Sequence, residues 1–236
     1  MTETLHMGDA TIVHGDAREL LASREFPLAD LLVSDPPYRL TSGGPSGLMG
    51  GIFDPANYDN SGEIVTTIEF DEWLARAFLA LKPDADAYFF LNDKNVVPFW
   101  LVASDAGFRW HNLLAWKKPN AVANRWYMKN AEFVIYAFKG KAKQINDCSA
   151  AQIISAPNPN GTSHPNEKPV GLLQVYIENS SEPGDLVIDP FLGSGSTAIA
   201  ALRSGRRFLG FECEREWFDI AAGRISREAD SPALPL

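Results

Sequence analysis

The sequence predicts a single α/β domain in which helices cover both faces of a mostly parallel sheet. Short apolar runs alternate with amphipathic stretches along the whole chain of 236 residues. Buried parallel strands joined by crossover helices produce this alternation. A content of 45% hydrophobic residues is enough for one substantial core. Neither a sequence repeat nor a low-complexity block divides the chain, so we interpret residues 1–236 as one domain.

Each element is predicted from its own pattern of apolar residues. Apolar runs that are short and rich in β-branched or aromatic residues predict seven strands: Thr11–Val13, Asp30–Ser34, Ala87–Leu91, Trp110–Trp116, Glu132–Phe138, Leu186–Asp189 and Phe208–Phe211. Amphipathic spacing predicts six helices between them: Ala17–Ser23, Asp71–Leu81, Asn95–Ala106, Val170–Ser180, Ser196–Ser204 and Glu214–Arg227. Two long connections, about 39–64 and 139–169, show no period, and loops of this length in a compact domain are usually functional.

Charge is unevenly distributed along the chain. Twenty-one Lys and Arg residues against 30 Asp and Glu residues give a formal net charge of −9, which by itself argues against a polyanionic partner. Segment 109–143, however, holds eight basic residues and one acid, a net of +7, so the remainder carries −16. Salt screens charges beyond about 8 Å at physiological ionic strength. A nucleic acid would therefore respond mainly to this basic segment.

The sequence favours a reduced, soluble protein without a metal. Cys148 and Cys213 lie 65 positions apart and show no spacing typical of a disulfide framework or a zinc site. We expect both to be buried free thiols. The first residues do not resemble a secretion signal, and no apolar run is long enough to span a bilayer. A cytoplasmic protein with no membrane partner is expected.

A glycine-rich turn follows the strand that ends at Asp189. Gly193 and Gly195 allow the backbone to pass close to a ligand, and the following helix N-terminus offers free N–H groups. Glu212, at the end of the next strand, can accept hydrogen bonds from both hydroxyls of a ribose. The turn also satisfies the loose dinucleotide fingerprint of dehydrogenases. Asp189, however, would repel a pyrophosphate and attract an ammonium group, which favours an amino-acid-bearing nucleoside.

The second motif, Asp35-Pro36-Pro37-Tyr38, closes another apolar strand. The prolines fix a rigid corner and remove N–H donors, so the Asp35 carboxylate and the carbonyl of Pro36 together offer acceptors to an amine. Tyr38 offers a flat face on which a base can stack. A plain strand-ending turn with a buried tyrosine is the alternative.

Together, the two motifs resemble the S-adenosylmethionine-dependent amino DNA methyltransferases of the permuted (beta) class, in which the catalytic motif precedes the cofactor motif. The matching stretches are 35–38, 164–169, 189–197 and 205–212, with Gly15-Asp16 as an acidic turn. The resemblance implies a methyltransferase (Rossmann-like) fold with a seven-stranded sheet and one antiparallel strand, here Glu132–Phe138. It also implies no metal, and by analogy it allows a homodimer.

The resemblance implies a role for each matching residue. Asp35, Pro36, Pro37 and Tyr38 would be catalytic. The residues implied for S-adenosylmethionine are Asp16, His164, Lys168, Asp189, Phe191, Gly193, Ser194, Gly195, Glu212 and Cys213. An Asp at position 35 resembles the adenine-N6 members, whereas Ser is usual in the cytosine-N4 members. The expected function is therefore site-specific N6-adenine methylation of DNA, with N4-cytosine methylation or a non-catalytic nucleic-acid-binding homologue as alternatives.

The basic segment predicts where DNA binds. Its positive and aromatic side chains suit phosphate and stacking contacts, and those assigned to DNA are Trp116, Lys117, Lys118, Arg125 and Lys129. Trp116 has two interpretations, since it can stack on an extruded base or pack inside its strand. Region 117–160 is the expected small target-recognition region.

Overall fold

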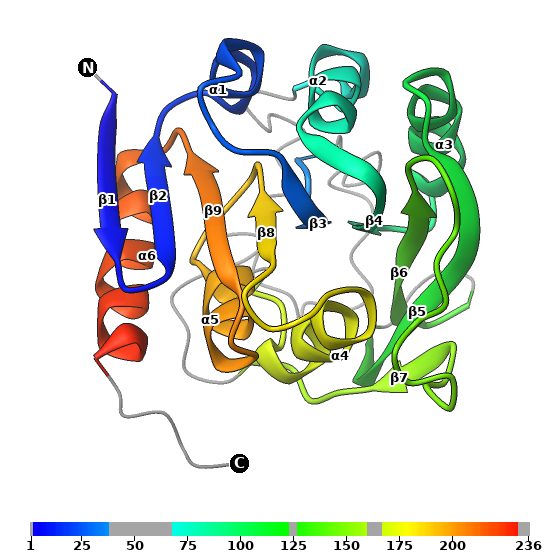
Figure 1. Ribbon diagram of the computed structural model, residues 1–236. Helices are drawn as coiled ribbons and strands as arrows, with labels where there is room; N and C mark the ends of the chain where they lie inside the picture. The colour runs from blue at the N-terminus through cyan, green and yellow to red at the C-terminus, as the bar shows by residue number, and fades with distance from the viewer. Residues whose placement is uncertain (1, 38–67, 123–126, 160–166, 231–236) are drawn as a thin grey trace, which may run out of the picture.

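The computed structural model describes residues 2–37, 68–122, 127–159 and 167–230. Within these residues the chain forms one sheet of nine strands in the order β1-β2-β9-β8-β3-β4-β6-β5-β7 (Figure 1). The strands are β1 Glu3–Met7, β2 Ala10–His14, β3 Ala29–Ser34, β4 Leu81–Leu91, β5 Arg109–Val122, β6 Lys129–Phe138, β7 Ile153–Ser155, β8 Leu186–Asp189 and β9 Arg207–Glu212. All seven predicted strands are present. The predicted reversed strand β6 runs antiparallel to β4 and β5, and β1 is a second reversed strand, which was not predicted.

The predicted count of seven was wrong by two strands at the sheet edges. β1 pairs antiparallel with β2 through a hairpin whose turn is Gly8-Asp9, with Gly8 at a φ of 56°. A two-residue Gly-Asp turn is a hairpin signal, and Leu5 and Met7 alternate toward the core. β7 has only three residues and pairs parallel with β5. So short an edge strand leaves no period in the sequence.

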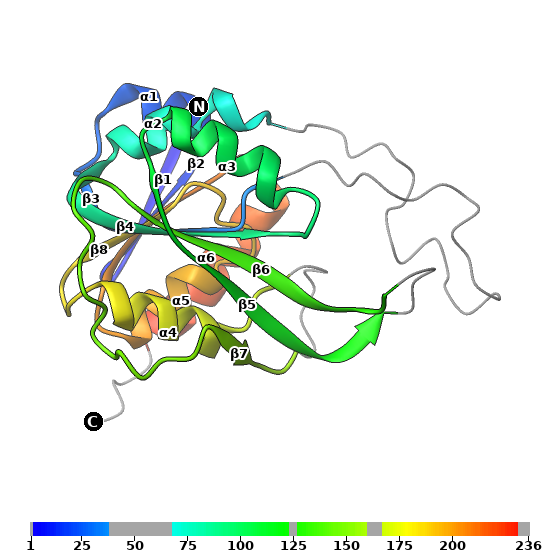
Figure 2. The same cartoon turned by 90° about the vertical axis from the view of Figure 1, so that its right-hand side faces the viewer.

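Helices cover both faces of the sheet, as expected (Figure 2). One face carries α1 Ala17–Ser23, α2 Leu74–Leu79 and α3 Val96–Asp105, and the other carries α4 Val170–Ser180, α5 Ser196–Arg203 and α6 Arg215–Ala229. The predicted helix Asp71–Leu81 is instead the 3-10 turn η2 (Phe70–Glu72) followed by α2, because Leu81 already pairs with Ala29 as the start of β4. None of the helices in the described part of the chain combines the length and the apolar character of a membrane span.

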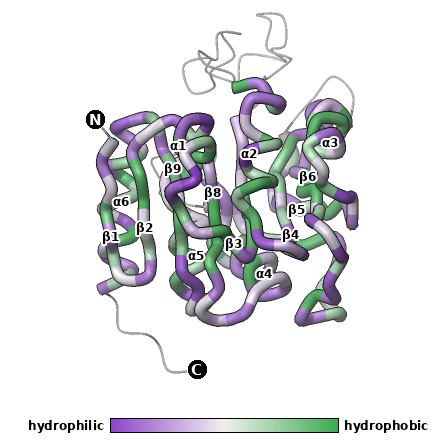
Figure 3. Tube along the Cα trace, turned by 45° about the horizontal axis from the view of Figure 1, so that its top comes forward, coloured by the Kyte–Doolittle hydropathy of each residue, from purple (hydrophilic) through white to green (hydrophobic). Residues whose placement is uncertain are grey.

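Alternate residues of each central strand feed two separate cores. Ile12 and Leu31 belong to the cluster beneath α4, α5 and α6, while their neighbours Val13 and Leu32 belong to the cluster beneath α1, α2 and α3. This period of two arises because successive strand side chains point to opposite faces. The strands β8 and β3 are hydrophobic along much of their length for this reason (Figure 3). The sheet is thus packed on both faces, and the predicted site lies where its parallel strands end.

Candidate active site

Two predicted motifs, far apart in the sequence, meet where β3 and β8 end side by side. The two strands pair in parallel through Leu31–Val187 and Leu32–Ile188. The hydroxyl of Ser34 donates to Oδ1 of Asp189 at 2.8 Å, and both side chains are buried. Asp35, the first residue of the predicted catalytic motif, therefore lies directly beside the strand that leads into the glycine turn. Neighbouring strand ends are where open α/β sheets bind ligands.

Asp189 is a buried carboxyl group at this junction. The N–H of Phe191 also donates to its Oδ1, at 3.0 Å. Burial raises the pKa of Asp189 to about 7, although hydrogen bonds from Thr197 and Ser34 oppose this rise. An ionised carboxylate that is buried without a partner is unfavourable in free energy, and a cationic partner stabilises it strongly. Asp189 is thus suited to the ammonium group of an amino-acid ligand.

The glycine turn and Glu212 form the second part of the site. Gly193 and Gly195 have φ values of 53° and 86°, which side chains disfavour, and α5 starts immediately afterwards. The N–H groups of Gly193 and Glu214 donate to the two carboxylate oxygens of Glu212 at 2.9 and 2.8 Å. Glu212 thus presents its carboxylate at the turn, where ribose hydroxyls could compete for it.

The residues at the turn fit S-adenosylmethionine. The hydroxyl of Ser196, at the start of α5, is buried and has no hydrogen-bond partner among the residues that the structure describes. Buried polar groups are usually paired, so an unpaired hydroxyl beside Asp189 and Glu212 is consistent with a polar ligand. Asp189 would hold the amino-acid end of the cofactor and Glu212 its ribose. Phe191 is half-buried and packs edge-on against Trp73, with ring centroids 4.9 Å apart.

The glycine turn is held by an ion pair between Arg224 and Glu167, here called the clasp, which the sequence did not indicate. Arg224 of α6 donates to both oxygens of Glu167, at 3.0 and 2.7 Å, and to the carbonyl of Ser194 at 2.8 Å. The hydroxyl of Ser194 lies 3.4 Å from the same carboxylate. Partly buried bidentate Arg–carboxylate pairs fix geometry well. The clasp joins three distant segments around the predicted cofactor turn.

The Asp35 carboxylate lies at one end of a row of four charged groups. Lys168 Nζ lies 2.5 Å from Asp35 Oδ2 and 2.9 Å from Glu132 Oε1, and Lys118 Nζ lies 2.8 Å from Glu132 Oε2. Burial raises the pKa of Asp35 to about 6 against the opposing effect of Lys168. At neutral pH Asp35 is mostly ionised and able to accept hydrogen bonds. Lys168, predicted to bind the cofactor, thus pairs with the carboxylate of Asp35, which is predicted to be catalytic.

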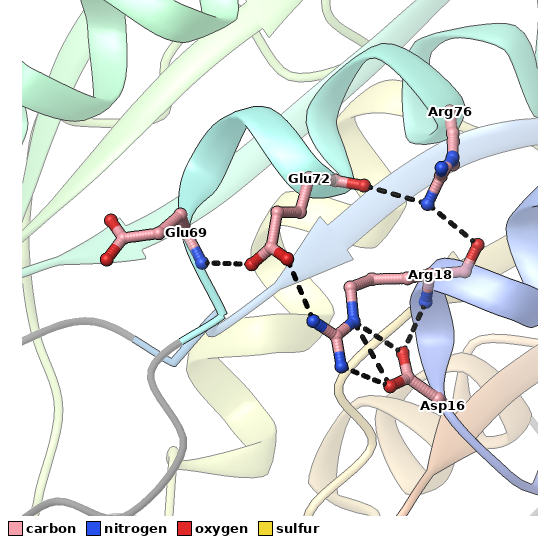
Figure 4. A network of polar contacts seen from close by, with 5 residues as sticks. All are labelled: Asp16, Arg18, Glu69, Glu72 and Arg76. Carbon is pink, nitrogen blue, oxygen red and sulfur yellow. Dashed lines mark hydrogen bonds and ion pairs between the residues drawn. The ribbon is translucent and has the colours of Figure 1, made fainter.

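Asp16 caps α1 and is held by Arg18. Its Oδ1 accepts the N–H of Arg18 at 2.8 Å, and the Arg18 guanidinium binds both carboxylate oxygens and reaches Glu72 at 2.9 Å (Figure 4). Arg76 donates to the backbone carbonyls of Arg18 and Glu72. Hydrogen bonds from Arg18 hold the pKa of Asp16 below its usual range. Asp16 is a fixed anion beside the end of β2, where the resemblance predicts contact with the adenine of the cofactor.

The residues predicted to bind DNA differ in their surroundings. Lys117 is exposed, and Lys129 is exposed and pairs with Asp93 at 2.9 Å. Trp116, by contrast, is 2% exposed, and its indole N–H donates to the carbonyl of Ala156 at 3.0 Å. Of its two interpretations, packing inside the strand fits this burial, and stacking on a base does not. Lys118 lies over the Trp116 ring, 4.6 Å from its centroid, and faces inward.

Three predicted residues, Tyr38, His164 and Arg125, lie outside the described residues. Pro36 is buried and Pro37 is half-buried in the described part of the corner. The expectation of buried thiols was wrong, because Cys148 and Cys213 are both exposed. Sequence reasoning overlooked Glu132, although a signal was available, since it is the single acid in the basic segment.

The chain is similar to known DNA methyltransferases over most of its length. Type II methyltransferase M2.DpnII of Streptococcus pneumoniae is 28% identical over 243 residues, covering 93% of this chain and 91% of its own. The crystal structure of the M1.HpyAVI–SAM complex matches with a TM-score of 0.71 and 25% identity, covering 91% of this chain and 99% of that one. PvuII DNA methyltransferase, described as cytosine-N4-specific, matches with a TM-score of 0.68 and 18% identity over 95% of this chain and 92% of its own, a likeness of fold.

A family model settles the relationship. The model is named for N6 and N4 methyltransferases and described as DNA methylase, and it matches residues 29–223. That range includes the Asp35 corner, the Arg224-bound segment before α4, and the glycine turn. The α/β methyltransferase fold is confirmed, with nine strands in the sheet instead of the predicted seven. The chain therefore belongs to the N6/N4 family of DNA methylases, enzymes that take their methyl group from S-adenosylmethionine.

Proposed function

We propose that this DNA methyltransferase transfers a methyl group to the N6 amino group of adenine, and that Asp35 and the Pro36 carbonyl receive that amine. The observation that carries the proposal is the junction of β3 and β8, where the Ser34 hydroxyl donates a hydrogen bond to the Asp189 carboxyl group at 2.8 Å. It brings the acceptor corner beside the carboxyl group suited to the amino-acid end of the cofactor. A target amine at Asp35 would lie close to a methyl donor held at Asp189 and Glu212.

The chemistry of the amine explains why acceptors are needed. The lone pair of an exocyclic amine is delocalised into the ring, which makes the nitrogen a poor nucleophile. S-adenosylmethionine, when bound, supplies a methyl group on a positively charged sulfur. Hydrogen bonds from the amine to the Asp35 carboxylate and the Pro36 carbonyl favour a tetrahedral nitrogen and stabilise the positive charge that develops on it. Asp35, ionised at neutral pH, can take the proton that the nitrogen releases.

Adenine rather than cytosine is supported by the Asp at position 35. The fold alone does not distinguish the two, because the cytosine-N4-specific PvuII enzyme shares it. The relatives named M2.DpnII and M2.MboI are Type II methyltransferases, which is consistent with a site-specific enzyme that belongs to a restriction–modification pair. Extruding an adenine from the duplex would cost a few kcal/mol in lost stacking and pairing, part of which stacking on a residue of the site would offset.

DNA contact is assigned to the basic segment. Its net charge of +7 belongs to segment 109–143, which contains β5 and β6. Lys117 is exposed and available to a phosphate, whereas Lys129 is exposed but would have to exchange its partner Asp93 for a phosphate. Region 117–160 is proposed as the target-recognition region. The exposed thiols of Cys148 and Cys213 suit a reducing compartment, and we place the enzyme in the cytoplasm.

The proposal is tested by incubating the protein with S-adenosylmethionine and unmethylated DNA and identifying the modified nucleoside by mass spectrometry. We expect N6-methyladenine. N4-methylcytosine as the sole product would refute the target assignment. As a control for the activity assay, the variant Glu228→Gln loses only the carboxylate that pairs with Arg203 at 2.8 Å, and it should retain full activity.

A further inference from the structure

The four charged groups behind the catalytic corner form a row with exposed ends and a buried middle. In order, the side chains of Lys118, Glu132, Lys168 and Asp35 are 32%, 10%, 8% and 30% exposed. Lys118 belongs to β5 and Glu132 to β6, Lys168 directly precedes Pro169, and Asp35 directly follows β3. Only Asp35 belongs to the motif that contacts the substrate in the proposed function. The other three need a separate explanation.

A buried row of charges is not explained by stability. Taking an ion pair out of water costs several kcal/mol, and hydrophobic replacements are often neutral or stabilising. Lys168 also lies 5.5 Å from the centroid of the Phe90 ring, in contact with the hydrophobic core. An ammonium group held there needs anions on both sides, and it has them in Asp35 and Glu132. The row therefore fixes the position of Lys168.

The arrangement also divides the charge of Lys168 between two carboxylates. A lysine paired with Asp35 alone would hold that carboxylate tightly and compete with the substrate amine for its lone pairs. Glu132, 2.9 Å from the same ammonium, draws part of the interaction away from Asp35. Lys118, 2.8 Å from the other oxygen of Glu132, keeps Glu132 ionised in turn. Burial and both lysines act on Glu132, and the lysines prevail in lowering its pKa.

We propose that Glu132 is a positioning residue for methyl transfer, which holds Lys168 beside Asp35 and sets how strongly that ammonium binds the catalytic carboxylate. Lys118 acts through Glu132 as the outer anchor of the row. The inference rests on the proposed function, since it assigns Asp35 to the substrate amine. It goes beyond that function in making the reactivity of Asp35 depend on three residues that need not touch DNA or cofactor.

The proposal predicts opposite effects for the two neighbours of Asp35. In Glu132→Gln the Lys168 charge is no longer shared, so Asp35 should become harder to protonate. The acidic limb of the kcat/KM profile for DNA, measured at saturating S-adenosylmethionine so that cofactor binding does not contribute, should then move down by about one pH unit, the size of effect that a nearby charge produces. In Lys168→Met the same limb should move up by a similar amount. A merely structural role would lower activity without moving the limb in either direction.

A charge-balanced variant guards against a folding defect. Glu132→Gln combined with Lys118→Met removes one anion and one cation and leaves the Lys168–Asp35 pair in place. It should fold, bind S-adenosylmethionine by calorimetry as wild type does, and show a smaller downward shift, because the Lys118 charge, which this variant lacks, also lowers the pKa of Asp35. Glu228→Gln removes an equal charge from an exposed helix pair and should leave the limb where it is.

A second readout needs no methyl transfer. In protein labelled with ¹³C at the aspartate carboxyls, the Asp35 resonance should titrate at lower pH in Glu132→Gln and at higher pH in Lys168→Met. This holds even if the wild-type product is not N6-methyladenine, so failure of the proposed function is distinguishable from failure here. An Asp35 titration that stays at its wild-type position, or moves upward, in a folded Glu132→Gln variant overturns the inference.

Discussion

The hydroxyl of Ser34 donates a hydrogen bond to the buried carboxyl group of Asp189 at 2.8 Å. This bond crosses from β3 to β8 and stabilises the ionised form of Asp189 against the burial that raises its pKa to about 7. Ser34→Ala should raise the Asp189 pKa further. We expect cofactor affinity to fall several-fold at pH 7 and to recover in part near pH 8, below the range in which the ligand ammonium is fully deprotonated, which calorimetric titrations at the two pH values would show. An equal loss at both would mean that Ser34 acts through packing instead.

Asp189 itself should link cofactor affinity to pH. Its ionised form attracts the ligand ammonium, so affinity for S-adenosylmethionine should rise as pH increases through about 7 and level off above it. Asp189→Asn should bind weakly and without this dependence. Calorimetry from pH 5.5 to about 8.5 would check both. A wild-type affinity that stays constant over this range would exclude the proposed contact.

Replacing Asp189 should also increase the free energy of unfolding. The folded-state pKa of Asp189 lies above its unfolded value of 3.8, so its contribution is most favourable below that value and is lost as pH rises to about 7. Asp189→Asn should therefore be more stable than wild type at pH 8, by up to about 4 kcal/mol at 1.36 kcal/mol per pKa unit. The two proteins should converge toward pH 4. Urea unfolding at both pH values measures the difference.

Much of the fold could be predicted from the sequence, because the spacing of apolar residues indicates which side chains of a strand or helix are buried. The predicted bounds of α1, α4 and β8 agree with the structure, since each begins or ends at a sharp change in polarity. Strand ends also revealed Asp35, Asp189 and Glu212, because parallel strands bring their carboxyl ends to one edge.

Ion-pair partners could not be predicted in the same way. Arg224 and Glu167 are 57 residues apart, and only the packing of α6 beside the glycine turn brings them together. Trp116 and Lys118 alternate onto the buried face of β5, and the composition of that segment does not reveal which face is inward. A basic segment therefore predicts a DNA-binding surface only once it is known which of its residues lie on the outward face of the strand.

The clasp on the glycine turn should matter for cofactor binding. Arg224→Met removes the donors to Glu167 and to the Ser194 carbonyl, so the turn loses its support and Glu167 is left without its partner. We expect S-adenosylmethionine affinity to fall about tenfold, equal to 1.4 kcal/mol, the scale of a charged hydrogen bond. Arg203→Met, which breaks the exposed pair with Glu228, is the control. Equal effects of the two variants would argue against the clasp.

Adjacent lysines on β5 offer a test of which face meets DNA. Lys117 is exposed, whereas the ammonium of Lys118 is bound to Glu132 at 2.8 Å. Each phosphate contact contributes about 0.9 to the slope of log K against log salt concentration. Lys117→Met should therefore reduce the slope by about 1, and Lys118→Met should leave it nearly unchanged while altering the pH profile. Fluorescence anisotropy with a labelled duplex at several salt concentrations measures both slopes. Should Lys118→Met alone reduce the slope, β5 would present its other face to DNA, and the assignment of Lys118 as the anchor of Glu132 would fail with it.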